Sequence, residues 1–99
     1  MPKFQLTNRA VEDLNDIWNY TFDEWSETQA DKYTNQLIEF CGEIASNPTI
    51  GKVYDNVGKD LFGLKANKHI IFYRVLNNKP IEITRILHGR MDLKNKFGK

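Results

Sequence analysis

The chain has 99 residues, of which 40% are hydrophobic and 27% are charged, and its formal net charge is +1. This length predicts one domain over residues 1–99, and the balance of apolar and charged residues argues against disorder. The lone Cys41 excludes an internal disulfide and no apolar run is long enough for a membrane span, so we expect a soluble cytoplasmic protein.

The first helix is predicted to begin after Thr7, which can cap it. Apolar or small residues then recur at steps of three and four, the period of one helix face. They are Ala10, Leu14, Ile17, Trp18 and Thr21. The polar residues Glu12, Asp13, Asn15, Asp16 and Asn19 are expected on the opposite, solvent-facing side.

A second helix is predicted from the capping-box spacing of Ser26 to Gln29 up to the stop at Asn47-Pro48. Its apolar stripe consists of Ala30, Tyr33, Leu37, Phe40, Cys41, Ile44 and Ala45. Cys41 is therefore expected to be a core residue rather than a nucleophile. The short link between Phe22 and Trp25 predicts that the two helices form an antiparallel hairpin.

The second half of the chain changes to the alternating period of strands. After a turn-rich stretch over 48–59, strands are predicted at Leu61–Ala66, His69–Leu76 and Ile81–His88, and Phe4–Leu6 is a short extended start. Strict alternation would put Ile81 and Ile83 on the same sheet face as Ile70 and Phe72.

The fold class is therefore predicted to be α+β, with an N-terminal antiparallel helical hairpin packed on a small, mainly antiparallel sheet. Both sheet faces carry apolar side chains, and two helices can cover only one of them. We expect the other face to meet the C-terminal segment, where Asp92–Lys99 can form a last helical turn, or another molecule.

Charge is divided unevenly along the chain. Residues 1–50 carry three basic and nine acidic side chains, whereas residues 51–99 carry eleven basic and four acidic ones. This division predicts an anionic partner for the second half, although acidic helices that complement a basic sheet would give the same pattern.

Several segments, in this order, resemble the ParE branch of the RelE/ParE toxin superfamily. They are Leu6-Thr7 with Ala10 and Asp13-Leu14; Ile17 to Thr21; Trp25 with Gln29-Ala30 and Tyr33; Ala45 to Pro48 with Ile50-Gly51; His69 to Arg74; and Arg85 to Asp92. The last segment is the most specific, because no strand periodicity requires His-Gly-Arg-Met-Asp after a strand. One departure is Leu61–Lys68, where the family has an arginine and this chain has Phe62-Gly63-Leu64-Lys65.

The resemblance implies the toxin of a bacterial type II toxin–antitoxin pair that traps the cleaved DNA complex of DNA gyrase. It also implies a ParD-like ribbon-helix-helix antitoxin that keeps the toxin inactive, and no cofactor. For gyrase or another anionic partner we expect contacts from Lys65, Lys68, Arg74, Arg85, His88, Arg90, Met91 and Asp92. For the antitoxin we expect contacts from Leu14, Trp18, Tyr33, Phe72 and Tyr73.

A ribosome-dependent RNA-cutting enzyme of the RelE branch is the alternative. In our alignment the basic residues of those nucleases fall at Ile70 and near Leu61 and Gly63, and no tyrosine follows Tyr73. We therefore predict no catalytic residues, although Arg90 matches a nuclease arginine and His88 could move a proton. A chain that has lost toxicity and serves as a binding or autoregulatory module is a third possibility.

Three further groups of residues, two histidines, two arginines and four aromatic residues, each allow two interpretations. His69 and His88 end neighbouring strands, but no Cys or carboxylate lies at ligand spacing, so we predict no metal site. Arg74 and Arg85 could contact a partner or pair with an internal acid such as Asp92. The aromatic residues Trp18, Tyr20, Trp25 and Tyr33 are expected to pack in the core rather than to form a partner hot spot.

Overall fold

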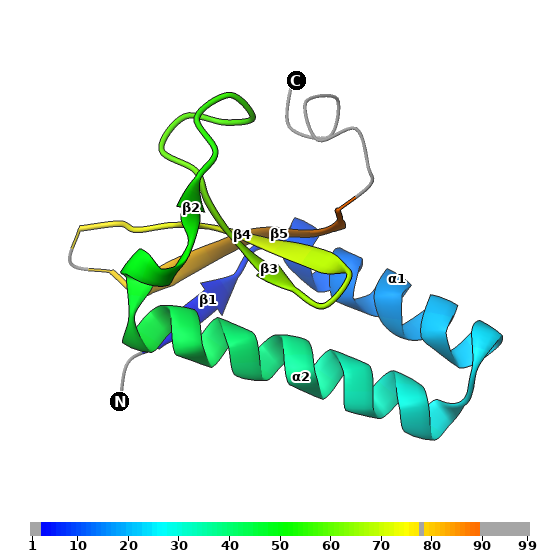
Figure 1. Ribbon diagram of the computed structural model, residues 1–99. Coiled ribbons are helices and arrows are strands. Elements are labelled where there is room, and N and C mark those ends of the chain that lie inside the picture. The colour runs from blue at the N-terminus through cyan, green and yellow to red at the C-terminus, as the bar shows by residue number, and fades with distance from the viewer. Residues whose placement is uncertain (1–2, 78, 90–99) are drawn as a thin grey trace.

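A helical hairpin covers one face of a five-stranded sheet in the computed structural model, which describes residues 3–77 and 79–89 (Figure 1). The helices are α1 (Asn8–Glu24) and α2 (Glu27–Ser46), followed by the short 3-10 helix η1 (Pro48–Ile50). The strands are β1 (Phe4–Leu6), β2 (Lys52–Val53), β3 (Phe62–Ala66), β4 (His69–Arg74) and β5 (Ile81–His88). The predicted α+β class and hairpin are confirmed.

Both predicted helix caps are present. Thr7 Oγ1 accepts a hydrogen bond from the backbone N–H of Ala10 at 3.0 Å, and Ser26 Oγ accepts one from Gln29 at 3.0 Å. The predicted stripe of α2 faces the sheet, and Cys41 is fully buried in it. Burial raises the pKa of the Cys41 thiol to about 12, so this side chain serves as a small core residue.

Two expectations for the hairpin are wrong. The periodicity predicts Asp13 on the solvent side of α1, but Asp13 is buried on the face that meets the sheet. Tyr20 and Trp25 were expected in the core, but their side chains are 66% and 76% exposed. They lie near the end of the hairpin, which extends beyond the sheet, so no strand covers them (Figure 1).

The strand order is β1-β5-β4-β3-β2, with β1 parallel to β5 and every other pair antiparallel. A β-bulge interrupts the pairing of β4 and β5, because Phe72 pairs with Arg85 while the next residue, Tyr73, pairs with Ile83. The extra residue, Thr84, shifts the alternation of side chains by one. Ile83 therefore lies in the helix-side core, and the predicted face for Ile81 and Ile83 is wrong.

A loop covers the sheet face that the helices leave open. Tyr54 and Val57 pack against a second core of Leu61, Ile70, Phe72 and Leu87. The ring of Tyr54 meets that of Phe72 edge-on, with 5.2 Å between the ring centroids. We call this covered side the loop-side face. Among the described residues it is this loop that meets the face; the C-terminal segment, with the predicted turn at Asp92–Lys99, lies outside those residues.

Gly63 of β3 allows the loop to approach this closely. A Cβ atom at this position would lie 2.7 Å from Cε1 of Tyr54 and 3.0 Å from Cγ2 of Ile70. Real Cβ atoms essentially never come as close to another atom as the first of these distances. Packing therefore requires glycine at position 63.

Candidate functional site

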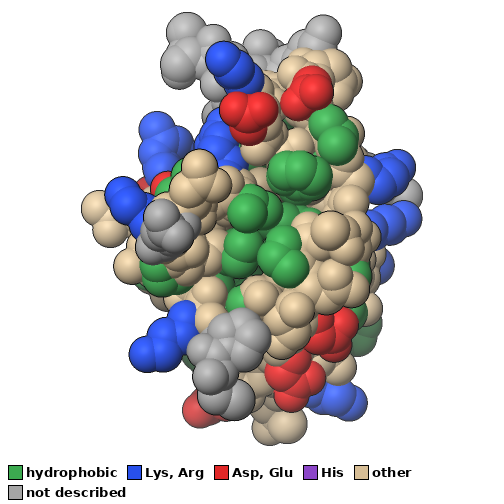
Figure 2. Space-filling model, turned by 90° about the vertical axis from the view of Figure 1, so that its left-hand side faces the viewer, with side chains coloured by type: hydrophobic (Ala, Val, Ile, Leu, Met, Phe, Trp, Pro, Cys, Tyr) green, Lys and Arg blue, Asp and Glu red, His purple; other side chains and the backbone are tan. Residues whose placement is uncertain are grey.

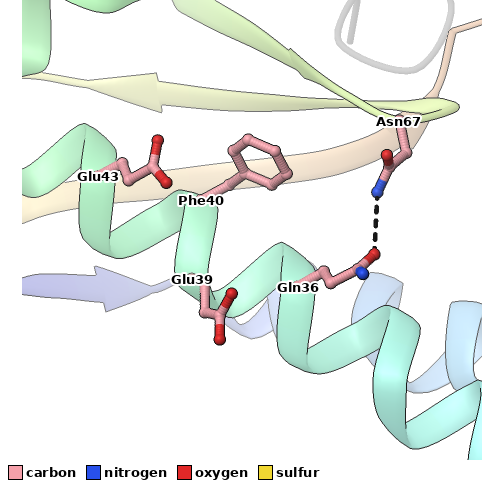
Figure 3. Close-up of a pocket in the computed structure, with 5 residues that line it drawn as sticks. All are labelled: Gln36, Glu39, Phe40, Glu43 and Asn67. Carbon is pink, nitrogen blue, oxygen red and sulfur yellow. Dashed lines mark hydrogen bonds between the residues drawn. The ribbon is translucent and has the colours of Figure 1, made fainter.

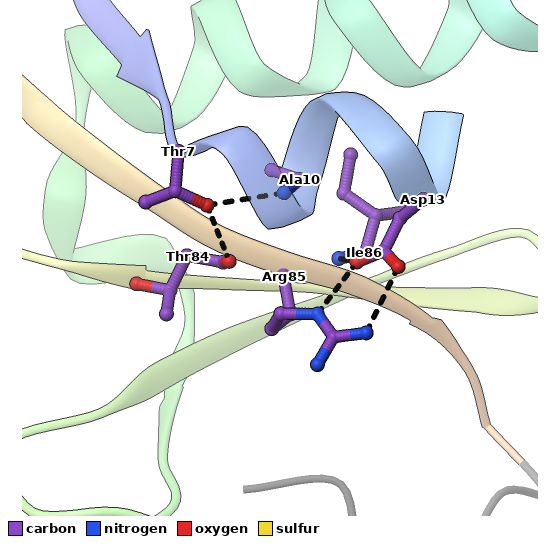
Figure 4. A network of polar contacts seen from close by, with 6 residues as sticks. All are labelled: Thr7, Ala10, Asp13, Thr84, Arg85 and Ile86. Atoms are coloured by element: carbon purple, nitrogen blue, oxygen red, sulfur yellow. Dashed lines mark hydrogen bonds and ion pairs between the residues drawn. The ribbon is translucent and has the colours of Figure 1, made fainter. Parts of the chain in front are cut away.

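The most buried charged group of the described chain is a carboxylate on α1 that binds β5 (Figure 4). Arg85 donates from Nε and Nη2 to the two carboxylate oxygens of Asp13, at 2.8 and 3.0 Å, and the backbone N–H of Ile86 donates to Oδ2 at 3.0 Å. The side chains of Arg85 and Asp13 are only 12% and 10% exposed. The hydrogen bonding of Arg85 to the Asp13 carboxylate raises the pKa of Arg85 above its ordinary value.

This network replaces a missing strand. β1 pairs with β5 only as far as Leu6 opposite Ile83, so the next residues of β5 have no strand neighbour on that side. Thr7 Oγ1 donates to the carbonyl of Thr84 at 2.8 Å, and Asp13 accepts from the N–H of Ile86. Arg85, which the sequence suggested as a partner contact, is thus bound inside the domain by an acid of α1.

The other predicted cations lie in two different places. Arg74 is at the loop-side face, where Nε donates to the carbonyl of Lys59 at 3.3 Å and Nη1 lies 4.0 Å from the Glu82 carboxylate. Its side chain is 30% exposed, and Lys65 on the neighbouring strand is exposed. Lys68, by contrast, belongs to the turn after β3 and lines a large groove on the helix side.

This groove, which we call the hairpin groove, lies between the end of the hairpin and one end of the sheet. Its volume is about 960 Å³. α1 and the link to α2 contribute Asp16, Tyr20, Glu24 and Trp25, α2 contributes Tyr33, and the sheet contributes Lys68, His69 and His88. Tyr33, Lys68 and His88 are the predicted site residues that the structure brings together.

The other predicted contacts do not join them. Leu14 packs against the helix-side core, and Trp18 donates to Asp31 Oδ1 at 2.9 Å and stacks on Phe22. Phe72 and Tyr73 are fully buried in the cores on opposite faces of the sheet, so neither forms part of the surface in this conformation. The predictions for Arg90, Met91 and Asp92 lie outside the described residues.

A tyrosine and two histidines form the floor of the hairpin groove. Tyr33 Oη lies 2.8 Å from Nδ1 of His69 and accepts a hydrogen bond from the N–H of Lys68 at 3.4 Å. The rings of His69 and His88 meet edge-on, with their centroids 5.4 Å apart. Burial, and next the neighbouring His88, lower the pKa of His69 to about 4, so its ring is neutral at pH 7 and its Nδ1 can accept a hydrogen bond from the Tyr33 hydroxyl.

This arrangement predicts a pH dependence of stability. In the unfolded chain His69 takes up a proton near pH 6.5, whereas in the folded chain it does so only near pH 4. The unfolded state therefore binds more protons between these values, and stability falls as pH is lowered from 6.5 to 4. Urea unfolding at pH 7 and pH 4.5 should show a smaller loss for His69→Gln than for the parent. Equal losses would contradict the assignment.

Within residues 3–77 and 79–89, no cluster of three or more His, Cys, Asp or Glu side chains could hold a metal ion. In the same part of the chain, no helix is long and apolar enough to cross a bilayer. In the hairpin groove, the floor carries hydrogen-bonding and aromatic groups, and the walls carry aromatic rings and carboxylates.

Sequence reasoning missed Asp13, Asp16, Tyr20, Glu24 and Trp25. A signal for Asp13 was present, because it lies three residues after Ala10 and four before Ile17, at the spacing of the buried stripe. Nothing in the periodicity showed that Tyr20 and Trp25 lie beyond the end of the sheet.

An apolar patch on another face completes the candidate surfaces. Figure 2 shows hydrophobic side chains gathered at the centre of the face that Figure 1 has on its left, where η1, β2 and the β4–β5 connection lie. Among the described residues of these three segments, the large exposed hydrophobic ones are Ile50, Val53 and Val75. Both basic and acidic side chains lie around the patch (Figure 2).

Three known proteins are similar to this chain over nearly its whole length. The chain is 35% identical to Toxin ParE1 of Mycobacterium tuberculosis over 91 residues, which cover 92% of this chain and 93% of that protein. It is 33% identical to Toxin ParE1 of Caulobacter vibrioides over 98 residues, 99% of this chain and 100% of the relative. Toxin ParE of Escherichia coli is 28% identical over 97 residues, 98% of this chain and 94% of that protein.

The fold is also that of a known structure. A chain of the "Chromosomal ParDE TA system from P. aeruginosa" superposes with a TM-score of 0.77, covering 89% of this chain and 96% of that chain at 20% identity. The sequence model described as "ParE toxin of type II toxin-antitoxin system, parDE" matches residues 4–93. The chain therefore belongs to the ParE toxin family of type II toxin–antitoxin systems.

Proposed function

We propose that this toxin inhibits DNA gyrase in the cytoplasm by binding and stabilising its cleaved DNA complex, and that residues 1–99 act as one domain. A ParD-like ribbon-helix-helix antitoxin neutralises it. Membership of the ParE family supports the toxin role, and the resemblance described above supports gyrase as the target.

One observation supports a binding mechanism rather than catalysis. It is the burial of the residues at or near the positions where our alignment places the basic residues of the RelE-type nucleases. Leu61 and Ile70 are buried in the loop-side core, and Gly63 is held against Tyr54. A phosphate-cleaving site needs exposed cations where charge develops in the transition state. In this protein Leu61, Gly63 and Ile70 pack the loop against the sheet, and none of them carries a positive charge.

The gyrase contacts are proposed to come from the loop-side face and the residues that follow β5. Lys59, Lys65 and Arg74 place cationic groups on or beside this face, and Arg90 follows in the sequence after Gly89. Val53 of β2 and Val75, the residue after β4, add exposed apolar side chains. An apolar centre with a charged rim is the usual composition of a protein interface, and cations favour an anionic enzyme–DNA surface.

A purified gyrase assay tests this function. The parent at micromolar concentration should stop supercoiling and accumulate cleaved DNA, and Arg90→Ala should need at least about tenfold more protein, as expected for losing a charged contact at an interface. Arg9→Ala, which changes an exposed arginine of α1, is the matched control and should act like the parent.

Four outcomes would contradict parts of the proposal. No effect of the parent on gyrase argues against the target. Codon-specific cleavage of messenger RNA in a translation extract would favour the nuclease alternative, and harmless overexpression without antitoxin would favour a binding module. Equal potency of Arg90→Ala and the parent would remove Arg90 from the site.

A further inference from the structure

The helical hairpin carries apolar side chains on a flank of each helix that the sheet does not cover. Val11, Trp18 and Phe22 of α1 and Ile38 of α2 each come directly after a buried residue. One position turns an α-helix by about 100°, so these four side chains lie to one side of the buried stripes. Val11, Phe22 and Ile38 are 42%, 46% and 36% exposed.

The two flanks face each other. Trp18 Nε1 donates a hydrogen bond to Oδ1 of Asp31 on α2 at 2.9 Å, and the Trp18 ring stacks on that of Phe22 with 5.2 Å between the centroids. The apolar side chains therefore follow the line along which the helices meet, on the side where solvent reaches them. We call this row the hairpin seam; it consists of Val11, Trp18, Phe22, Ile38 and Gly42.

Gly42 continues the seam on α2, four residues after Ile38. A glycine inside a helix lowers helix stability relative to alanine. Packing among the described residues does not require it, because a Cβ atom at this position would have no other atom within 4 Å beyond its own helix turn. The missing side chain instead leaves room for the backbone of another helix to approach α2 closely.

The opposite flank of α2 already has a contact inside the domain. Asn67 of the β3–β4 turn donates a hydrogen bond to Gln36 at 3.3 Å (Figure 3). Phe40, Glu39 and Glu43 line a cavity of about 240 Å³ beside this bond. On α2 the flank left to a partner is therefore the one that carries Ile38 and Gly42.

Uncharged residues accompany the seam. Asn15 lies between Val11 and Trp18 in the helix period, and Asn35 lies three residues before Ile38; both are exposed. The one carboxylate on this line, that of Asp31, already accepts the hydrogen bond from Trp18. The centre of a protein interface is depleted of charge, and an amide both donates and accepts hydrogen bonds, so identical amides on two copies can bond each other. This composition fits a second copy of the chain.

The area of the outer hairpin face is sufficient for a weak dimer. The helices have 17 and 20 residues and extend about 25–30 Å, and two packed helices are together about 20 Å wide. Each copy would therefore cover about 500 Å² of this face, and a pair about 1,000 Å², which is near the lower limit for a specific interface. We expect association in the micromolar range.

We propose that the hairpin seam binds the hairpin seam of a second copy, so that the two hairpins form a four-helix arrangement in which the helices approach most closely at Gly42. A two-fold pair of this kind is the commonest form of homo-oligomer. The sheet lies on the other side of both helices (Figure 1), so the dimer would leave the loop-side face of each copy free. The proposal does not depend on gyrase as the target.

Sedimentation equilibrium of the purified full chain over about 10–500 µM tests the association. The parent should show a monomer–dimer equilibrium, and Phe22→Lys/Ile38→Lys should weaken it at least tenfold by placing charges in the apolar seam. The control Val53→Lys/Val75→Lys, which changes two exposed apolar residues of the other patch, should associate like the parent.

Gly42→Gln separates docking from folding. The added side chain meets open space within the monomer and removes a helix-weakening glycine, so the monomer should melt at the same temperature or higher. The same side chain would occupy the space needed by the second copy, so dimerisation should weaken at least tenfold. Equal association of Gly42→Gln and the parent would exclude a close approach at this residue.

Cross-linking locates the contact. Cys41 is fully buried, so Asn35→Cys provides one accessible thiol beside the seam, and a short bismaleimide should join two copies. Lys65→Cys, on an exposed residue of β3, is the matched control and should stay uncross-linked. Cross-linking of Lys65→Cys alone would place the contact elsewhere and overturn the proposal.

Salt dependence distinguishes the seam from association driven by the uneven charge of the chain. The exposed charges beside the seam are mainly acidic, with Glu12, Asp23 and Glu39 against Lys32, so 1 M salt should screen their repulsion and tighten the dimer. Weaker association in 1 M salt would indicate contact between the acidic hairpin of one copy and the basic half of another. A parent that stays monomeric up to 500 µM, or a dimer that only Val53→Lys/Val75→Lys disrupts, would also overturn the proposal. So would a monomeric parent whose seam variants lose antitoxin binding, because the antitoxin would then cover the seam.

Discussion

Replacing Asp13 with alanine should lower the free energy of unfolding by about 3–5 kcal/mol, because it leaves the buried Arg85 charge without its partner. The same change also removes the acceptor of the Ile86 N–H, which has no strand neighbour on that side. Both losses weaken the attachment of α1 to β5, so the hairpin and the sheet lose their main polar connection.

Chemical denaturation of Asp13→Ala, Arg85→Met and the double variant measures this effect as a mutant cycle. The double variant should be more stable than Asp13→Ala, because it no longer buries an unpaired charge. Asp16→Ala, three residues further along α1 and exposed, is the control and should change stability by no more than about 0.5 kcal/mol. A loss below about 1 kcal/mol for Asp13→Ala would show that water replaces the carboxylate and that the site is not effectively buried.

Replacing Tyr73 with alanine should cost about 3–5 kcal/mol, the usual range for removing a large buried aromatic side chain. Tyr73 is fully buried and its ring stacks on that of Phe62 at 5.6 Å between centroids. Its hydroxyl donates to the carbonyl of Pro48 at 2.7 Å and accepts from the N–H of Gly51 at 3.0 Å. One side chain thus connects β4 to both ends of the segment that leads from α2 into β2.

The conservative change Tyr73→Phe separates packing from hydrogen bonding. It keeps the ring and removes the hydroxyl, so it should cost about 1–3 kcal/mol by leaving the Pro48 and Gly51 groups without that partner. Tyr20→Ala, at an exposed tyrosine of α1, controls for the loss of an aromatic ring and should be nearly neutral. Wild-type stability of Tyr73→Phe would show that these bonds contribute nothing net.

Local sequence patterns were sufficient for most of the elements. Capping by Thr7 and Ser26 located the starts of both helices, and proline after Asn47 located the end of α2. Alternation and β-branched residues located β5 to the residue, and β3 and β4 to within one or two. These features depend on contacts between residues close in sequence, so they can be read from the chain alone.

The short strand β2 and the parallel pairing of β1 were not predicted. Two residues give no periodicity, and the direction in which Phe4–Leu6 pairs depends on β5, which lies at the other end of the chain. The covering of the loop-side face was also missed, because Tyr54 and Val57 lie in a turn-rich stretch with no regular pattern.

For the candidate sites, the sequence determined the family resemblance, the helical hairpin and the uneven charge. Only the tertiary structure decided which charged and aromatic residues are available to a partner. Arg85 forms an ion pair with Asp13, which lies 72 residues away in sequence. The extra residue of the β-bulge, Thr84, places Ile83 on the helix side of the sheet. Trp25 is exposed because it lies in the link between the helices, at the end of the hairpin that extends beyond the sheet. Contacts between segments distant in sequence decide which side chains are buried, how strands are aligned and where one packed element extends beyond another. A local pattern of residues contains no information on these contacts.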